Sequence, residues 1–438
     1  MSSLDLAGLG QRLAKFEPFP LEGRVRRILS GEIEADGPDV SVGMQCEVFP
    51  SSGESPVRAL VAAVREDRIA LVPFAPVSSL RVGDRVQALP AHQQFPCSDQ
   101  FAGRAVNGLG EAIDGKASPA GDSGRFDLLP VLDRVTPTQP FVTGLRAIDG
   151  MLTVGCGQRL GVFAASGVGK SRLIEQIVEQ AECERVVVCQ VGERGREVEA
   201  LWRRLEETGQ RERCSLVAAT SDEAAPMRAR AVDQALALAD YWRSRGEHVL
   251  LVVDSITRLA MALREIGLIA GEPPTARAYT PNVFRELPRI VERCGAARSG
   301  GSITAIFTVL CETDEADDPL VEVMKSLLDG HIVLSRNLAQ AGHFPAVDVL
   351  RSISRLFENL APAAQSQAAQ RCRALLARYE ESRILVESGM YKPGSDRELD
   401  QAIAARARIN DFLRQRSDES FPLAETSRAL QGLAVDHV

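Results

Sequence analysis

Between residues 141 and 360, short apolar runs alternate with longer stretches in which apolar residues recur at helical spacing. The runs read RLGVFA, RVVVCQV, SLVAAT, HVLLVVDS, SITAIFTVL and HIVLS. Stretches such as KSRLIEQIVEQAE and EAAPMRARAVDQALALADYWRS lie between several of them. Continuous apolar strands separated by helices are typical of a parallel sheet that is flanked by helices. The pattern therefore predicts an α/β domain over residues 141–360.

The pattern differs on either side of this domain. Over residues 21–90, short alternating runs are broken by Gly, Pro, Asp and Ser, which predicts a small β-barrel or sandwich, and we expect a barrel. Residues 91–140 carry Gly and Pro at short intervals and are expected to form a loop-rich connecting segment. Residues 361–438 are rich in Ala, Arg, Glu and Leu, which predicts a helical domain interrupted at YKPGSD.

The first 20 residues form a short arm with its own pattern. Leu4, Leu6, Leu9 and Leu13 stand at roughly helical spacing, and two glycines weaken the helix. Such an arm either becomes ordered on a partner or is a frayed terminus, and the sequence leaves both interpretations open.

Composition narrows the class of protein. The chain has 438 residues, of which 45% are hydrophobic and 25% charged, and its formal net charge is -8. This acidic balance does not favour nucleic acid as a partner. The nine cysteines are scattered without a CxxC pair, which favours reduced thiols over disulfides or metal sites. We find no apolar run long enough to cross a bilayer and no signal-peptide order at the start, so we expect a cytoplasmic protein.

One short stretch carries candidate chemistry. The sequence AASGVGKS begins at Ala164 and lies between an apolar run and a helical stretch. It matches a phosphate-binding loop except that Ala164 replaces the opening glycine. Small residues let backbone N–H groups surround phosphate oxygens in front of a helix N-terminus, while Lys170 reaches the β- and γ-phosphates and Ser171 coordinates Mg²⁺. The predicted nucleotide-binding residues are Ala165, Ser166, Gly167, Val168, Gly169, Lys170, Ser171 and Arg172.

The alanine at position 164 raises the question whether this loop still works. It matters only if the backbone there needs a positive φ, which would strain an alanine. Because Ala164 keeps a small side chain and the later glycines remain, we expect a functional loop. A scaffold that binds nucleotide without hydrolysing it is the alternative.

Charged residues follow two of the other apolar runs, where open α/β sheets place their ligands. Glu193, in QVGERGREVE, is a candidate to hold and polarise an attacking water, and Arg194 to orient that water or contact phosphate. Asp254 ends the run HVLLVVDS, where its carboxylate would hold Mg²⁺. The alternatives are a solvated surface position for Glu193 and a helix N-cap for Asp254. Arg258 lies one turn further on and would face the phosphates.

Several longer motifs stand in the order of a known family. They are AASGVGKS, GERGREVE, DSITRLAMALREIGLIAGEPP, GGSITAIFTVL and LDGHIVLSRNLAQAGHFPAVDVLRSISR. From about residue 20 to its end, the chain resembles the export ATPases of the bacterial flagellum and of type III secretion injectisomes, which are relatives of the catalytic subunit of the rotary ATP synthase. The stretch AYTPNVFRELPRIVER and the run LDGHIVLSR favour the export branch over the synthase.

The resemblance implies roles for individual residues. Glu193 matches the general base, Asp254 the Walker-B acid and Arg258 a phosphate-side arginine. Arg355, in SISR, matches an arginine finger that reaches into a neighbouring subunit's site, and Phe344, in GHFPAVD, matches the aromatic residue that packs on adenine. A finger that acts on a neighbour requires a ring, so the resemblance also implies a homohexamer.

The implied function is hydrolysis of ATP with Mg²⁺ to energise protein export. The enzyme would sit at the cytoplasmic face of the inner membrane, release chaperones and unfold substrates at an export gate. The N-terminal arm would bind a regulatory, stator-like protein. We favour the flagellar branch over the injectisome branch on overall similarity. A rotary proton-pumping subunit would need a stalk-engaging acidic loop, which we do not find. An RNA translocase would need basic residues interleaved with exposed aromatics in its N-terminal domain, but residues 22–90 have few aromatics and mixed charge.

The chain departs from the family pattern at several positions that carry no catalytic group. These positions are Ala164, Ala278, Thr280, Cys311, Thr313 and Met390. The resemblance implies that Ala278 and Thr280 lie near the central pore of the ring. These two departures therefore concern how substrates are handled rather than hydrolysis.

Overall fold

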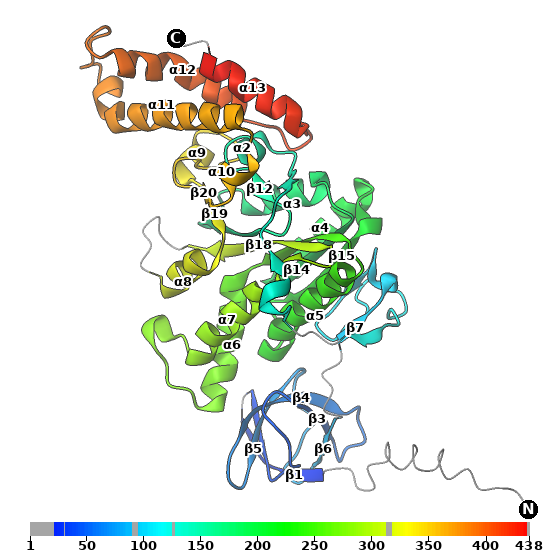
Figure 1. Cartoon of the computed structure of the whole chain (residues 1–438). Coiled ribbons are helices and arrows are strands. Elements are labelled where there is room, and N and C mark those ends of the chain that lie inside the picture. The colour runs from blue at the N-terminus through cyan, green and yellow to red at the C-terminus, as the bar shows by residue number, and fades with distance from the viewer. Residues whose placement is uncertain (1–21, 30, 90–94, 125–127, 312–317, 436–438) are drawn as a thin grey trace, which may run out of the picture.

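The computed structural model describes most of the chain as three regions in sequence order. The described residues are 22–29, 31–89, 95–124, 128–311 and 318–435. The arm 1–20 and Thr313 lie outside them. A barrel occupies one end of an elongated molecule, the sheet-containing core lies in the middle, and the C-terminal helices occupy the other end (Figure 1).

The N-terminal region is a closed antiparallel barrel, so the barrel expected from the sequence is confirmed. The strand order around it is β1-β2-β5-β4-β3-β6. Alternate residues point inward, and Val48, Val61 and Leu71 are fully buried there. The strands are β1 (Glu22–Leu29), β2 (Glu32–Ala35), β3 (Gln45–Phe49), β4 (Val57–Val64), β5 (Ile69–Pro73) and β6 (Arg85–Ala88).

The segment after the barrel contains short elements that join the core. Ala105 and Val106 pair in parallel with the strand Cys214–Thr220, and Arg134 and Val135 pair with Gly295–Ala297. The elements are β7 (Phe95–Cys97), η1 (Asp99–Phe101), β8 (Ala105–Val106), β9 (Asp122–Gly124), η2 (Val131–Asp133), β10 (Arg134–Val135) and β11 (Pro140–Phe141).

The core is built on one sheet with the order β20-β19-β13-β18-β16-β14-β15-β8, in which only β20 of this series runs antiparallel to its neighbour. All six runs expected to be strands are strands, which confirms the α/β prediction. The core strands are β12 (Val154–Gly155), β13 (Arg159–Ala164), β14 (Arg185–Glu193), β15 (Cys214–Thr220), β16 (His248–Asp254), β17 (Gly295–Ala297), β18 (Ser302–Leu310), β19 (Gly330–Val333) and β20 (Ile353–Ser354).

Helices cover both faces of this sheet (Figure 1). Along β16, Leu250 and Val252 face an apolar cluster that contains Ile177, whereas Val249 and Leu251 face the cluster of Trp242. Burying each such side chain contributes about 1.5–3 kcal/mol. The helices are α2 (Arg146–Asp149), α3 (Lys170–Gln180), α4 (Gly195–Glu207), η3 (Arg211–Arg213), α5 (Ala225–Ser244), α6 (Ile256–Ala270), η4 (Ala276–Ala278), α7 (Pro281–Arg293), α8 (Pro319–Leu327), α9 (Arg336–Gln340) and α10 (Phe357–Leu360).

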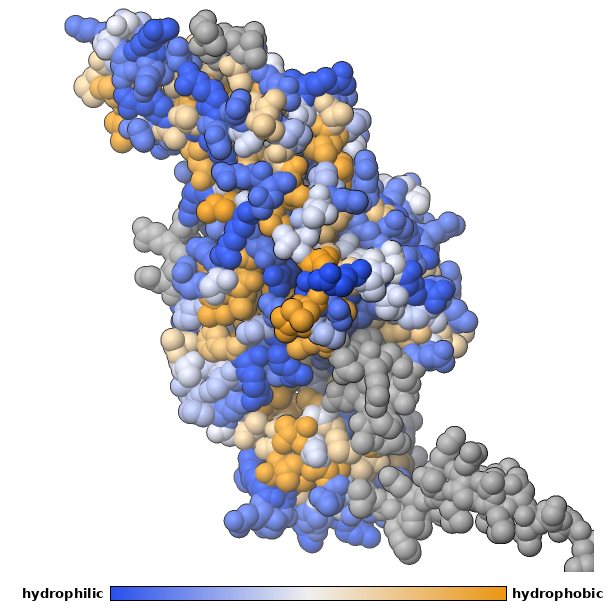
Figure 2. All heavy atoms as spheres, in the orientation of Figure 1, coloured by the Kyte–Doolittle hydropathy of each residue, from blue (hydrophilic) through white to orange (hydrophobic). Residues whose placement is uncertain are grey.

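The C-terminal region is helical, as expected, and consists of α11 (Ala363–Glu387), α12 (Arg397–Leu413) and α13 (Leu423–Val435). The chain turns between α11 and α12 at YKPGSD, where Asp396 accepts hydrogen bonds from the first N–H groups of α12. Hydrophilic residues dominate the visible surface of these helices, while hydrophobic residues gather on the barrel and the middle of the core (Figure 2). Among the described residues, no helix combines the length and apolar character needed to cross a bilayer.

Candidate active site

The loop between β13 and α3 has the backbone of an anion-binding loop. Gly167 has a φ of 80° and Gly169 a φ of 93°, a region that strains every residue with a side chain. Gly169 is the N-cap of α3, and no described side chain caps that end, so its first N–H groups remain available to an anion. A Cβ added to Gly167 would meet no described atom within 4 Å, so the loop faces open space.

The remaining loop residues divide into two groups. Ala165 and Val168 are buried in the apolar core, while Ser166 and Ser171 are exposed. The guanidinium of Arg172 donates to Ser417 Oγ at 3.0 Å, which ties the start of α3 to the C-terminal region. The loop therefore presents its backbone and its serines to the outside, while its apolar side chains hold it against the sheet.

Ala164 itself is the last residue of β13. It pairs with Leu310 in the sheet, its carbonyl accepts from the N–H of Cys311, and its side chain is buried. The described non-glycine residues with a positive φ are Thr153, Arg277 and Ala278, so Ala164 is not among them. The backbone at position 164 thus has no requirement for glycine.

A compact cluster of charges lies directly behind the loop. The Lys170 ammonium forms ion pairs with Asp254 and, at 3.7 Å, with Glu193 Oε1. The hydroxyl of Thr308 donates to Asp254 Oδ1 at 2.6 Å. The three charged side chains are only 7–12% exposed. Because burial of a lone charge is costly, the shared ammonium holds both carboxylates in place at the strand ends.

Burial raises the pKa of the Glu193 carboxyl, and the nearby negative charge of Asp254 raises it further, while Lys170 and Arg258 lower it. Burial is the largest of these influences. A carboxylate whose pKa lies above its ordinary value is a better proton acceptor and water-polarising group than a solvated one. The position of Glu193 behind the loop also rules out the alternative of a solvated surface group.

The two arginines singled out near Glu193 have different surroundings. A Cβ added to Gly192 would lie 3.0 Å from Arg258 Cβ, so Arg258 runs alongside the backbone that carries Glu193. Arg258 Nε is buried without a hydrogen-bond partner in the described part of the chain, which leaves it able to bind a ligand oxygen. Arg194 is exposed at the start of α4.

The two roles considered for Asp254, metal ligand and helix N-cap, fall on two adjacent residues. Asp254 ends β16, whereas Ser255 is the N-cap of α6, and its hydroxyl accepts from the Arg258 N–H at 3.3 Å. Asp254 is therefore spared the capping role and points to Lys170 and Thr308.

Phe344 lies beside the loop although it follows α9, far away in sequence. A Cβ added to Gly169 would lie 3.3 Å from Phe344 Cε1, and the ring is 36% exposed. The Phe344 carbonyl accepts from the Gln415 N–H at 2.9 Å, and the Gln415 side chain bonds the backbone of Gly144 and Arg146. An exposed aromatic ring at this position suits the flat face of a nucleobase.

Arg355 lies at the opposite end of the sheet. It follows the edge strand β20, and its N–H donates to the Asp329 carbonyl, level with Arg159 at the start of β13. The phosphate loop leaves the other end of β13, roughly 16 Å away along five residues of strand. The structure therefore brings together Lys170, Glu193 and Asp254, and leaves Arg355 exposed away from them.

Two groups near the site were not found from the sequence. Thr308 was visible as a polar residue inside an apolar strand, on the same face as Thr304, although the contact with Asp254 was not. The segment 414–419 contacts α3 through Gln176 and Gln180 and reaches Phe344 through Gln415. No local sequence signal marks such a long-range contact.

Those departures from the family pattern that fall on described residues lie outside the charge cluster. Cys311 is half-buried beside Ala164, and Met390 is exposed. Ala278 adopts a φ of 60°, a conformation that favours glycine, and Thr280 is buried at the N-cap position of α7.

The fold and this site define the chain as a P-loop nucleotide-binding protein, with a glycine loop after a central strand and an acid at the end of another strand. A model of the ATP synthase alpha/beta family, nucleotide-binding domain, matches residues 144–354, and a model of the T3SS EscN ATPase C-terminal domain matches residues 361–432. The chain belongs to the flagellar and type III secretion ATPases of this family, and it is an ATPase.

Named relatives come from both branches. The chain is 42% identical to the flagellum-specific ATP synthase of Bacillus subtilis (strain 168), over 94% of each protein. It is 40% identical to the type 3 secretion system ATPase of Xanthomonas euvesicatoria, also over 94% of each. Among solved structures, the assembled ATPase EscN of enteropathogenic E. coli is 37% identical, with a TM-score of 0.89 over 94% of this chain and 100% of that one. EscN has also been solved with its central stalk EscO.

Proposed function

We propose that this chain hydrolyses ATP with Mg²⁺ to energise protein export through a flagellar-type or injectisome-type secretion apparatus. The observation that carries the proposal is the Lys170 ammonium shared between Glu193 and Asp254 directly behind an open glycine loop. This arrangement contains a phosphate-binding cation, a candidate base and a candidate metal ligand within one buried cluster. The family matches and the relatives in both branches support the reaction.

The binding step uses charged groups that are already paired with one another. The loop N–H groups from Gly167 to Lys170 bind the β- and γ-phosphates, and the Lys170 ammonium turns from its carboxylate partners to the phosphates. Its departure leaves Asp254 available to a metal ion. Phe344 packs on the base at the exposed side of the loop, and Arg258 contacts the phosphates from the side of Glu193.

The donor set fits Mg²⁺ shared with phosphate oxygens. Among the described residues there is no group of three or more His, Cys, Asp and Glu side chains that forms a metal cage of its own. Mg²⁺ is usually bound by one or two protein oxygens together with substrate phosphates and water. Asp254 and Ser171 would supply those oxygens, and the ion would neutralise charge on the β- and γ-phosphates.

The hydrolytic step is an in-line displacement by water. Glu193 holds and polarises the attacking water, and Arg194 assists from the exposed start of α4. The water oxygen forms a new bond to the γ-phosphorus, and the bond from this phosphorus to the oxygen that bridges the β- and γ-phosphates breaks. Glu193 accepts the proton of the attacking water. Lys170 stabilises the charge on the transferring phosphoryl group.

The neighbouring subunit completes the site. Arg355 is exposed at the end of the sheet opposite to its own loop, which supports a role at the nucleotide of another copy of the chain. We propose a homohexamer in which Arg355 acts as an arginine finger across each interface. The assembled state of the relative EscN supports this arrangement.

The proposed division of the chain follows the sequence: an arm over 1–20, a barrel over 21–90, a connecting segment over 91–140, an ATPase domain over 141–360 and a helical domain over 361–438. The arm would bind a stator-like regulatory protein. The ring would act at the cytoplasmic face of the inner membrane, where it releases chaperones and unfolds substrates at the export gate. We favour the flagellar branch.

ATP turnover at rising protein concentration tests the proposal, with Glu193→Gln and Arg355→Ala beside the wild type. We expect the rate per subunit to rise with concentration and both variants to lose about a thousandfold or more. Glu199→Gln on α4 and Arg285→Ala on α7, both at exposed positions, are the matched controls and should retain turnover. A wild type that binds ATP but never turns it over would instead favour the non-hydrolysing scaffold.

A further inference from the structure

Arg355 has little secondary structure to hold it. The strand that precedes it, β20, consists of Ile353 and Ser354 and lies on the edge of the core sheet. It pairs with β19 through only two residue pairs, Gly330 with Ser354 and His331 with Ile353. A charge that must reach a neighbouring subunit's phosphate needs tighter placement than such a short edge strand provides.

A buried glutamine contacts two groups that hold the finger in place. Gln158 is fully buried at the start of β13, and its Oε1 accepts from the Gly155 N–H at 2.8 Å. Its Nε2 donates to Ser354 Oγ at 3.0 Å and to the Asp329 carbonyl at 3.2 Å. The same carbonyl accepts from the Arg355 N–H at 2.9 Å. Gln158 thus contacts both the residue before Arg355 and the carbonyl that binds Arg355.

The side chain of Asp329 is in turn held by Arg159. Asp329 Oδ2 accepts from Arg159 N at 3.1 Å and from Arg159 Nε at 2.9 Å, while Oδ1 accepts from Nη2 at 3.0 Å. The N–H of Asp329 donates back to the Arg159 carbonyl at 2.9 Å. A two-pronged arginine–carboxylate pair combines strength with fixed geometry, so the Asp329 carbonyl cannot drift along the sheet.

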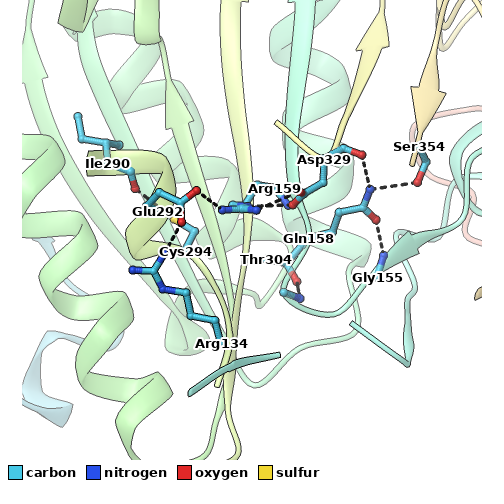
Figure 3. Close-up of polar contacts among 11 residues, drawn as sticks. Arg134, Gly155, Gln158, Arg159, Ile290, Glu292, Cys294, Thr304, Asp329 and Ser354 are labelled. Atoms are coloured by element: carbon cyan, nitrogen blue, oxygen red, sulfur yellow. Dashed lines mark hydrogen bonds and ion pairs between the residues drawn. The ribbon is translucent and has the colours of Figure 1, made fainter. Parts of the chain in front are cut away.

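The network continues away from the finger. Arg159 Nη1 donates to Glu292 Oε1 at 3.0 Å, and the other oxygen of Glu292 accepts from Arg134. Figure 3 shows these side chains as a continuous row from Arg134 to Ser354, close to the starts of the core strands. Within the described residues, none of these side chains has a buried nitrogen or oxygen atom that lacks a hydrogen-bond partner.

Gly330 brings the edge strand close to this network. A Cβ added to Gly330 would lie 2.5 Å from the Ile353 carbonyl oxygen and 3.1 Å from Ser354 Cα. Only a residue without a side chain lets β20 approach so closely. The finger is therefore seated by backbone contact as well as by hydrogen bonds.

We propose that Gln158, Arg159 and Asp329 form a finger anchor, a set of positioning residues that aims Arg355 at the nucleotide of the neighbouring subunit. The anchor lies at the opposite end of β13 from its own subunit's loop. Its loss therefore impairs the neighbour's site and spares its own. This inference rests on the proposed trans action of Arg355.

The test uses Asp329→Asn, which keeps the size of the side chain and removes its charge. Displacing a catalytic group by about 1 Å can cost about a hundredfold, so we expect turnover to fall roughly 10- to 100-fold with nucleotide affinity unchanged. Arg159→Met should give the same loss, and the double variant should be no worse than either single one. Glu247→Gln is the matched control, because it breaks the Arg185–Glu247 pair of similar exposure at the same end of the sheet.

Mixed rings separate positioning from damage. Asp329→Asn and Glu193→Gln subunits are mixed while dissociated and then assembled in equal amounts. The first variant has an intact site and the second an intact finger, so about one quarter of the interfaces in randomly mixed rings should be active. Recovery to about that share of the wild-type rate is expected. Mixing Asp329→Asn with Arg355→Ala should give no recovery, because neither subunit offers a working finger.

The outcomes distinguish the anchor from the proposed function. If Arg355→Ala recovers with Glu193→Gln but Asp329→Asn does not, then Asp329 supports its own site and the anchor proposal is wrong. If Asp329→Asn alone turns over ATP at the wild-type rate, the proposal is wrong as well. If Arg355→Ala fails to recover with Glu193→Gln, the trans finger itself is rejected, and the anchor with it.

Discussion

The two ends of the core sheet carry their charges in different ways. At the carboxyl ends of the strands, Lys170 serves two carboxylates, and Arg258 Nε and His343 Nε2 are buried without a partner among the described residues. At the amino ends, Arg159 and Asp329 satisfy one another with several hydrogen bonds, and Gln158 uses both ends of its amide. The loop end leaves bonding capacity for a ligand, whereas the network of Gln158, Arg159 and Asp329 at the other end is saturated.

This difference fits the function proposed for each end of the sheet. A site that binds a highly charged ligand needs groups whose present partners can be exchanged for phosphate and metal, and such groups are held at some expense of stability. An element that only places a charge for a neighbour needs the opposite, a network in which every bond is already made. Substitutions at the two ends should therefore fail differently: at the loop end in the subunit's own site, and at the amino end in the site of its neighbour.

The largest effect is expected from Lys170→Ala at the loop end. Without the ammonium, the phosphates lose their main cation and the pKa of Glu193 rises further, because Lys170 now lowers it. Turnover should fall on the order of 10²- to 10³-fold, with weaker ATP binding. Steady-state hydrolysis and nucleotide titration measure both, beside Lys325→Ala on α8. Mixing with finger-deficient Arg355→Ala subunits should restore about one quarter of the wild-type rate, because each variant supplies what the other lacks. Mixing with Glu193→Gln subunits should restore none, because both variants lack a working site, and recovery in this second mixture would break the comparison.

A smaller loss is expected from Gly330→Ala at the amino end. The added methyl group must push Ile353 and Ser354 of β20 away from β19, which costs about 1–3 kcal/mol of unfolding free energy. Turnover should fall because Arg355 moves, while ATP affinity stays the same. Denaturant unfolding and ATP titration measure the two effects. Gly432→Ala, in α13 and with open space around its added Cβ, is the control and should not lose stability.

The sequence predicted the strands and the loop end of the sheet well because both are encoded locally. The apolar run HVLLVVD and the following Ser255 are sufficient to place Asp254 at a strand end and a helix start behind it. The positive φ angles of Gly167 and Gly169 explain why glycine occupies these positions of the loop. Phe344 and Arg355 were singled out only through the family resemblance, because their places beside Gly169 and Asp329 depend on distant parts of the chain.

The amino end could not be predicted for the same physical reason. Gln158 and Arg159 are neighbours in the sequence, but Asp329 follows 170 positions after Arg159, and nothing near either segment requires the two to meet. Likewise, Thr308 stands out as polar within its strand, but only the register between β16 and β18 places it next to Asp254. Local pattern determines which element forms, while pairing across the sheet determines which side chains meet.

A pH-dependent loss of stability is expected at the loop end. Burial and the charge of Arg414 lower the pKa of His343 from an ordinary 6.5 to about 4. Between those values the unfolded chain binds more protons than the folded one, so stability is complete above pH 6.5 and decreases as the pH falls toward 4. At pH 5 the loss is about 2 kcal/mol. Urea unfolding from pH 7 to pH 5 measures it.

His343→Gln should flatten this part of the pH profile, and His331→Gln is the comparison. Burial also lowers the pKa of His331, but His331 lies in β19 at the other end of the sheet. If the wild type and His343→Gln lose stability in parallel, His343 is not the group that titrates, and the contrast between the two ends loses this support.

The smallest effect is expected from Ala164→Gly, which restores the usual glycine of the loop. Since Ala164 is a buried strand residue with an ordinary φ, glycine gains nothing from its freedom there and loses the contact of the methyl group with the core. We expect turnover within about twofold of the wild type and a stability loss of about 0.5–1 kcal/mol. Gly169→Ala is the contrast, because its φ of 93° and the nearby Phe344 ring both exclude a side chain. A strong rise in turnover for Ala164→Gly would show that the loop end is limited by this alanine, and that its strand geometry changes when nucleotide binds.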